Sequence, residues 1–183
     1  MGSQLTKNYD VEKDPYIHGG LHGLWRVHRA KKKATSDSAD VSIFMFDKKT
    51  KTKGQTAQQQ LEAFELLKKD AANLAKFRHP SMLSLIEAPI EDKTCIAFVT
   101  EPVEFNLATL LNDKSKSELI PSEIDLKCLV LELMEVVNFL HANAKSIHCN
   151  ISPEHIYVTK TGKLKIAGLN FLLPFSSADP VPT

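Results

Sequence analysis

The sequence has few cysteines, almost no net charge and no long apolar run, and each absence excludes a class of protein. Its three cysteines, at positions 95, 128 and 149, form no CxxC pair, so the sequence predicts neither a zinc site nor a disulfide framework. Lysine and arginine number 23 against 22 acidic residues, which argues against nucleic acid or an anionic membrane as partner. No apolar run reaches the roughly 18 residues of a membrane span, and Met1–Tyr9 lacks the apolar core of a signal peptide. We therefore expect a cytoplasmic protein without a membrane span.

What the chain does have is the composition and periodicity of an α+β domain. Of its 183 residues, 43% are hydrophobic and 25% are charged, as in ordinary globular proteins. Apolar residues recur at steps of three and four over 57–77, which predicts an amphipathic helix that ends near Pro80. Ser122, with Asp125 three residues later, predicts the start of a second helix that runs to about His141 and is apolar on several sides. Strands are expected at 24–30, 41–46, 82–86 and 95–100, and a β-hairpin over 156–159 and 163–167.

Several segments, in the correct order, resemble a protein kinase. Ser146–Ile156 (SIHCNISPEHI) is similar to the catalytic loop, and Lys163–Phe171 (KLKIAGLNF) to the metal-binding turn that follows it. Upstream, Phe77–Pro80 is similar to the segment after the kinase αC helix, Thr100–Val103 to the hinge between the lobes, and Val41–Phe44 to the strand that carries the ATP-binding lysine. The fold class we expect is α+β, protein kinase-like. Its parts would be a flexible N-terminus (1–17), a β-rich N-terminal lobe (18–100), a hinge with the truncated start of a helical C-terminal lobe (101–175), and a loose tail (176–183).

The chain departs from the kinase pattern at the positions that carry chemistry. The resemblance places Phe44 where kinases have the phosphate-binding lysine, and Asp70 where they have the glutamate that orients this lysine. We expect Phe44 to be a core or pocket-filling aromatic and Asp70 to be an acid on the helix surface. The catalytic base, the phosphate-facing lysine and two metal ligands correspond, in that order, to Asn150, Ser152, His155 and Gly168. No catalytic residue and no metal ligand is therefore expected, and we expect neither ATP nor Mg²⁺ to bind.

The glycine loop is also altered. Its three glycine positions correspond to Gly20, His22 and Trp25, although Gly23 leaves another register open. A tryptophan in this loop should obstruct the close approach of phosphate to the backbone. The resemblance implies a vestigial nucleotide cleft in which an adenine could still contact the hinge main chain, lined by Gly20, Gly23, Phe44, Thr100, Glu101 and Val103.

Five other residues have both a structural and a chemical interpretation. Lys48 or Lys49 could substitute for the missing lysine, and Asn170 could supply a neutral metal ligand. His148 is expected to be a packed scaffold residue. Cys149 is expected to be a structural thiol, because no histidine–aspartate pair is arranged in the sequence to activate it.

Among kinase-like families, the sequence most resembles the Scy-like pseudokinases, in particular the member associated with clathrin-coated vesicles. The segments that carry this resemblance are 41–49 (VSIFMFDKK), 97–103 (AFVTEPV) and 148–154 (HCNISPE). The resemblance implies an inactive scaffold in clathrin or Golgi–endosome traffic, peripheral to those membranes. Its protein partners would bind mostly through regions that these 183 residues lack. Two alternatives remain open: a weak or atypical ATP-binding kinase, and a fragment without independent function.

The helix expected from Ser122 to His141 also suggests self-association. In kinases the corresponding helix packs against further helices of the C-terminal lobe, which would follow the last residue of this chain. We therefore expect Leu129, Leu133, Val136, Val137 and Leu140 to be partly unburied and to make the isolated chain self-associating or molten.

Overall fold

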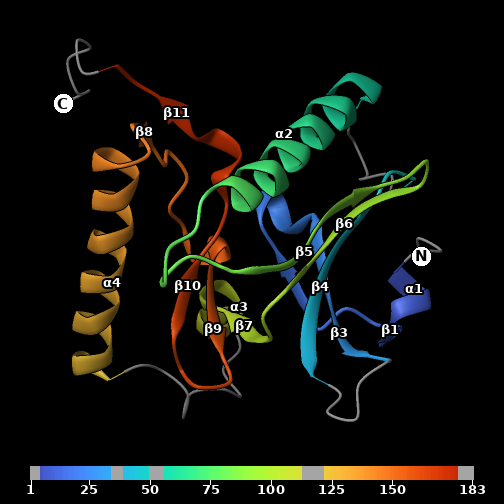
Figure 1. The fold of residues 1–183 in the computed structure, drawn as a ribbon, viewed down its shortest axis with the longest axis horizontal. Helices are drawn as coiled ribbons and strands as arrows, with labels where there is room; N and C mark the ends of the chain where they lie inside the picture. Colours follow the sequence, from blue (N-terminus) through green and yellow to red (C-terminus); the bar gives the residue numbers. More distant parts are fainter. Residues whose placement is uncertain (1–4, 34–38, 50–55, 113–121, 177–183) are drawn as a thin grey trace.

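The computed structural model describes residues 5–33, 39–49, 56–112 and 122–176. Figure 1 shows a β-rich lobe with one long helix, α2 (Ala57–Lys76), joined to a smaller part that contains α4 (Glu123–Ala142) and a β-hairpin. The smaller part also holds α3 (Leu107–Asn112), β7 (Val103–Asn106), β8 (Ser146–Ile147), β9 (Ile156–Thr159), β10 (Leu164–Ile166) and β11 (Leu173–Pro174). The arrangement confirms the expected α+β, kinase-like fold.

A six-stranded antiparallel sheet forms the β-rich lobe, in the order β1-β3-β4-β6-β5, with β2 paired to β3. Both faces of β4 are buried, because Phe44 and Phe46 belong to one apolar cluster while Val41, Ile43 and Met45 belong to the other. The strands are β1 (Tyr9–Val11), β2 (Ile17–Gly19), β3 (Trp25–Lys32), β4 (Asp40–Asp47), β5 (Leu85–Glu91) and β6 (Cys95–Thr100).

Residues 5–17 differ from the flexible N-terminus that the sequence predicted. They form α1 (Leu5–Asn8) and β1, and β1 pairs with the second half of β3. The side chains of Leu5 and Tyr9 are buried in the apolar cluster on the outer face of the sheet, and Tyr9 donates a hydrogen bond to Glu87 at 2.5 Å. Residues 1–4 of that predicted terminus, and most of the predicted tail, lie outside the described residues.

Both long helices begin at the capping boxes that their sequences encode. Thr56 caps α2 together with Gln59, and Ser122 caps α4 together with Asp125, each pair exchanging two hydrogen bonds. The strand expected at 82–86 lies further along the chain, since β5 runs from Leu85 to Glu91, and it includes a proline. That proline is tolerated because β5 is an edge strand.

Helix α4 buries a narrower stripe than its sequence suggested. It lies at the edge of the molecule opposite α1 (Figure 1), and it packs against β8 and β10. Leu129, Val136 and Leu140, which we expected to be partly unburied, are buried, and Leu133 and Val137 are half-buried. The expectation was therefore wrong for Leu129, Val136 and Leu140, and it holds for Leu133 and Val137. The exposed apolar side chains of α4 are Ile124, Leu126, Val130, Leu131 and Met134.

Candidate functional site

Aromatic rings fill the space between the sheet and the hairpin of the smaller part. Phe44 stacks on Phe98 with 4.9 Å between ring centroids and meets the edge of Tyr157 at 5.2 Å. Trp25 contacts Phe98 edge-on at 4.9 Å. Each of the four side chains is only 1% exposed. Phe44 is thus a core aromatic, as expected, and the position of the missing lysine is part of a continuous apolar core.

Asp70 is buried, so its interpretation as an acid on the helix surface was wrong. It follows Leu67 at the helical spacing that faces the core, and only 3% of the residue is exposed. Its Oδ2 atom accepts a hydrogen bond from the indole Nε1 of Trp25 at 3.0 Å, and its Oδ1 atom accepts one from the Leu169 amide at 2.7 Å. Burial raises the pKa of Asp70 from 3.8 to about 6, although these hydrogen bonds favour the ionised form. A tryptophan therefore takes the place of the lysine as the partner of this carboxylate.

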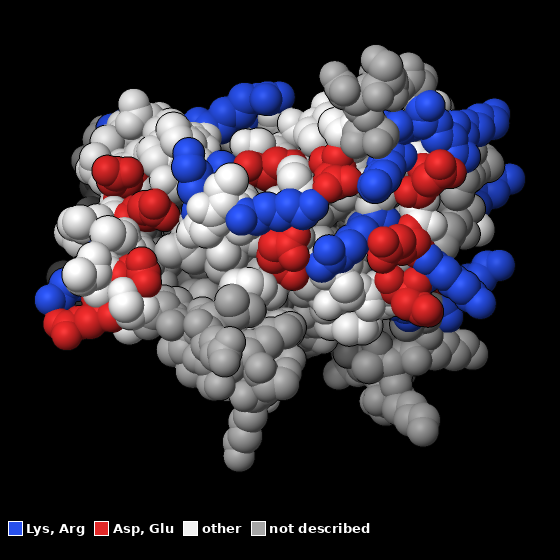
Figure 2. Space-filling model, turned by 90° about the horizontal axis from the view of Figure 1, so that it is seen from below, with Lys and Arg blue, Asp and Glu red and all other residues white. Residues whose placement is uncertain are grey.

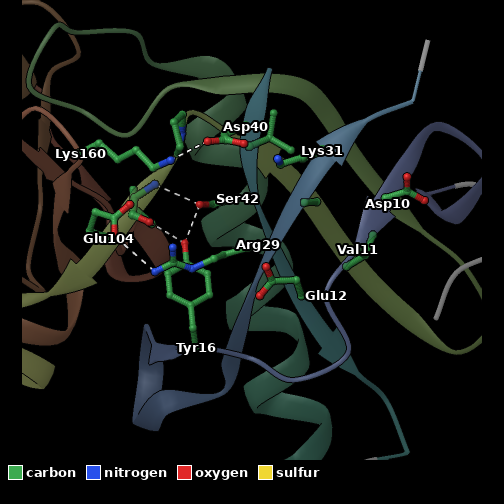
Figure 3. A pocket seen from close by; sticks show the side chains of 14 residues that line it. Asp10, Val11, Glu12, Tyr16, Arg29, Lys31, Asp40, Ser42, Glu104 and Lys160 are labelled. Atoms are coloured by element: carbon green, nitrogen blue, oxygen red, sulfur yellow. Dashed lines mark hydrogen bonds and ion pairs between the residues drawn. The ribbon is translucent and has the colours of Figure 1, made fainter. Parts of the chain in front are cut away.

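The hinge main chain is already hydrogen-bonded within the protein. The Val103 amide donates to Ser42 Oγ at 3.0 Å, and the Tyr16 hydroxyl donates to the Val103 carbonyl at 2.6 Å. Since the Tyr16 proton is used there, Ser42 donates to the Tyr16 oxygen at 2.7 Å and closes the network (Figure 3). Burial raises the pKa of Tyr16 to about 12, so the phenol stays protonated. An adenine that contacts Val103 would have to compete with Ser42 for its amide and share its carbonyl with Tyr16.

A polar cavity of about 460 Å³ opens beside this network. Four of its charged side chains form two ion pairs, Arg29 with Glu104 at 3.3 Å and Lys160 with Asp40 at 2.5 Å (Figure 3), and Asp10, Glu12 and Lys31 also line it. Acidic and basic side chains are likewise interleaved over the face that Figure 2 shows. Neither the cavity nor that face carries the excess of positive charge that phosphate groups would require.

The catalytic-loop residues form a chain of hydrogen bonds with one another. Ser152 donates to Glu154 at 2.7 Å, so the Nδ1–H group of His155 must donate to Ser152, at 2.9 Å. The Nε2 atom of His155 then accepts from the Asn150 amide at 3.3 Å, and this amide also donates to the Asn170 oxygen at 2.8 Å. Burial lowers the pKa of His155, which keeps the ring neutral. The amide at position 150 is therefore a hydrogen-bond donor to neighbouring side chains and offers no base for a substrate hydroxyl.

The position of the metal-binding aspartate is filled by the His155 ring. Gly168 has φ +81°, and a Cβ atom there would lie 2.2 Å from His155 Cδ2. The oxygen of Asn170, the candidate substitute ligand, is used by Asn150. Among the described residues, no group of three or more His, Cys, Asp or Glu side chains is placed to hold a metal ion. The residues that are present do not fit Mg²⁺, which requires several oxygen ligands.

The remaining predicted residues support the scaffold of the site or lie outside it. The buried His148 ring donates a hydrogen bond to the Ala167 carbonyl and accepts one at Nδ1 from the backbone N–H of Asn150, and burial lowers its pKa to about 4. Cys149 is exposed and has φ +57°, so it is not the packed structural thiol that we expected. Lys48 pairs with Glu91 at 2.9 Å, and its ammonium group lies over the Phe64 ring, 4.5 Å from the centroid.

The glycine loop is closed onto the catalytic loop. Gly20 donates its amide to the Glu154 carbonyl at 3.3 Å, and its φ of +68° brings it against the Trp25 ring. Gly23 also has a positive φ, and its amide donates a hydrogen bond to the Gly20 carbonyl at 3.1 Å, within the turn itself. The Thr100 hydroxyl donates to the Glu101 carbonyl at 2.9 Å. The residues of the predicted cleft are thus engaged by neighbours within the protein, and three of these neighbours gave no signal in the sequence: Tyr16, Ser42 and Tyr157.

No protein-family model matches the chain. The chain is 33% identical over 190 residues to human SCY1-like protein 2, covering 98% of this chain and 20% of that protein. It is 30% identical to the Dictyostelium discoideum protein named "Probable inactive serine/threonine-protein kinase scy1", covering 94% of this chain and 19% of the relative. It is 27% identical to the Schizosaccharomyces pombe serine/threonine-protein kinase srb10, covering 91% of this chain and 46% of that protein.

The fold, the degenerate site and these similarities define a protein kinase-like domain. The chain belongs to the Scy-like family of such proteins. It spans about a fifth of the length of the SCY1-like relatives that it matches. Among the residues that the structure describes, no helix is both long and apolar enough to cross a membrane.

Proposed function

We propose that this chain is a catalytically inactive pseudokinase module that binds neither ATP nor Mg²⁺ and acts as a protein-binding part of a scaffold in clathrin or Golgi–endosome vesicle traffic. The observation that supports inactivity most directly is the aromatic cluster. Phe44, Phe98 and Tyr157 pack together where ATP would need open space. Phosphoryl transfer depends on positioned charges around the phosphates, and an apolar core offers none.

The loss of chemistry extends over the whole site. The catalytic base is replaced by the Asn150 amide, and the phosphate-facing lysine by Ser152, whose proton is donated to Glu154. The position of the metal carboxylate is occupied by the His155 ring. Because such groups act together, each loss alone would impair a kinase severely and their combination leaves no partial mechanism.

A thermal-shift titration with ATP, with and without Mg²⁺ or Mn²⁺, tests this proposal. A ligand at 100 times its Kd stabilises a protein by about 2.7 kcal/mol, which is readily measured, and an active protein kinase serves as the positive control. We expect no metal-dependent shift and no phosphate transfer from radiolabelled ATP to a generic substrate. A micromolar, Mg²⁺-dependent Kd would contradict the proposal.

A weak ATP-binding kinase is the second candidate, and the similarity to srb10 favours it. It would require the Phe44 ring to leave the cluster and another cation to replace the lysine. Lys48 is engaged by Glu91 and by the Asp92 carbonyl at 2.8 Å, so it would have to exchange these partners for phosphate. Phosphate transfer that is lost in a Lys48→Met variant would establish this candidate.

The role in vesicle traffic is supported by membership of the Scy-like family. Partners would bind largely through segments beyond these residues, on the cytoplasmic side of Golgi, endosomal or clathrin-coated membranes. Fractionation of cells that express the tagged protein tests the assignment. We expect the tagged protein to be enriched in purified clathrin-coated vesicles relative to a cytosolic marker protein. If the tagged protein and the marker are distributed equally, the assignment is contradicted.

A further inference from the structure

A second cavity, which shares Arg29, Glu104 and Lys160 with the cavity beside the hinge, lies between α4, the end of α3 and the β9–β10 hairpin. Its volume is about 700 Å³, within the range of protein ligand sites. Helix α4 contributes Asp125, Cys128, Leu129 and Glu132, which follow one another at steps of three, one and three and so share one face. The apolar side chains that line the opposite walls are Phe105, Leu110, Val158 and Leu164. We call this cavity the α4 groove; none of the five exposed apolar residues of α4 lines it.

The charges that line the α4 groove are balanced except at Glu132. Arg29 and Lys160, at one end, are paired with Glu104 and Asp40. Asp125 is used in the capping box of α4. Glu132 as a whole is half-buried, but its Oε2 atom is buried and, within the described part of the chain, has no hydrogen-bond partner.

A buried, unpaired carboxylate oxygen is costly, and native structures seldom keep one without a reason. A ligand that brings a cation to this oxygen would remove the cost. A phosphate or an anionic lipid would instead meet a negative charge, so the electrostatics favour a basic ligand. The apolar walls would at the same time cover an aliphatic or aromatic group of that ligand.

We propose that the α4 groove binds a short segment of a partner protein in which an apolar side chain lies next to a lysine or arginine. The apolar group enters between Leu129 and Leu164, and the cation pairs with Glu132. This inference extends the proposed scaffold role by naming a partner class. The proposed peptide site does not involve the nucleotide cleft. The ATP titration and the peptide-binding experiment below therefore test separate proposals, and one can fail while the other succeeds.

The test uses fluorescence polarisation with the purified chain and a pool of fluorescein-labelled octapeptides. Each peptide carries two leucines and two arginines at varied spacings. We expect saturable binding for a subset of spacings, and no binding for matched peptides in which glutamate replaces arginine or serine replaces leucine. Glu132→Gln keeps the shape of the side chain and removes its charge. It should weaken binding by about tenfold or more, since coupling energies of close charge pairs exceed ~1.4 kcal/mol.

Glu123→Gln is the matched control, because Glu123 lies on the same helix, outside the α4 groove, in an exposed pair with Lys127. It should leave binding unchanged. Thermal unfolding of both variants checks that they fold, and the peptide charge reversal tests the wild-type protein without any variant. The proposal is wrong if no peptide binds, or if Glu132→Gln binds as tightly as the wild type. It is also wrong if Glu132→Gln instead abolishes self-association, because the occupant would then be a second copy of this chain.

Discussion

Adding one methyl group at Gly168 tests the claim that His155 occupies the place of the metal-binding side chain. The backbone at Gly168 has φ +81°, and the new Cβ atom would lie 2.2 Å from His155 Cδ2 and 2.4 Å from Cγ. The imidazole cannot move aside freely, because its two nitrogen atoms bond to Ser152 and Asn150. Gly168→Ala should therefore impose both backbone strain and a steric clash.

The two contributions can be separated with a second glycine. Placing a side chain in the left-handed region costs about 1–2 kcal/mol, and overpacking a buried site adds about 1–3 kcal/mol. We thus expect Gly168→Ala to lower the free energy of unfolding by about 2–5 kcal/mol. Gly162 has φ +75° with nothing within 4 Å of the Cβ position. Gly162→Ala should therefore cost only the backbone contribution, about 1–2 kcal/mol.

Urea unfolding followed by circular dichroism provides the measurement, at a protein concentration where sedimentation shows a single species. In a double-mutant cycle, His155→Ala removes the ring that the new methyl group would strike. The Gly168→Ala substitution should then cost about 1–3 kcal/mol less in the His155→Ala background than in the wild type. If Gly168→Ala costs no more than Gly162→Ala, or if the cycle shows no coupling, the ring does not fill this position and the argument fails.

Four further predictions concern pH, catalysis and association. The pKa of Asp70 is raised from 3.8 to about 6, so its ionisation contributes a loss of stability as the pH rises from about 4 to 6. Over that window the free energy of unfolding of Asp70→Asn, from urea titrations, should rise by on the order of 3 kcal/mol relative to that of the wild type. A difference between the two proteins that does not change with pH would contradict this. His148, with a pKa lowered to about 4, contributes in the opposite sense, because its protonation in the unfolded chain costs stability as the pH falls from about 6.5 to 4. His148→Gln should remove that contribution, seen in urea titrations as a loss of stability relative to the wild type that shrinks toward acid pH. Asn150→Asp alone should recover no measurable phosphate transfer, and recovery in a radiolabelled ATP assay would show that the other positions remain competent. Replacing the exposed α4 residues Leu126, Val130 and Met134 by glutamine should reduce self-association, measured by sedimentation at rising protein concentration. An unchanged sedimentation profile would show that this surface does not mediate self-association.

Local signals made the helices predictable, whereas the filling of the cleft depends on contacts between distant segments. The capping box of Ser122 and Asp125 involves residues three positions apart, and it forms as predicted. Asp70 was misread because its partners, Trp25 and Leu169, lie 45 and 99 residues away along the chain. An acidic residue three positions after Leu67 on an amphipathic helix can lie in the core or at the edge of the core, and periodicity alone does not decide between these two places.

The two tyrosines of the site illustrate the same limit. Tyr157 lies on a short apolar strand, where an aromatic residue is ordinary. It meets Phe44 only because the hairpin folds back under the sheet. Tyr16 precedes β2 and reaches the Val103 carbonyl, 87 positions away. Family motifs locate the positions where chemistry has been lost, but they do not reveal which side chains from elsewhere have taken up the space.

The packing of these side chains bears on what it would take to reverse the proposed loss of activity. A lysine at position 44 would bury an ammonium group beside Phe98 and Tyr157, while its natural partner, Asp70, is held by Trp25. Releasing Asp70 would require Trp25 to change as well, and an aspartate at position 168 would require His155 to change first. The residues at these two positions are thus held by neighbours, Phe44 by Phe98 and Tyr157, and Gly168 by the His155 ring, so a single reversion should cost core stability before it restores chemistry. The packing of the vestigial site, as much as the absence of individual catalytic groups, therefore opposes a return to phosphoryl transfer.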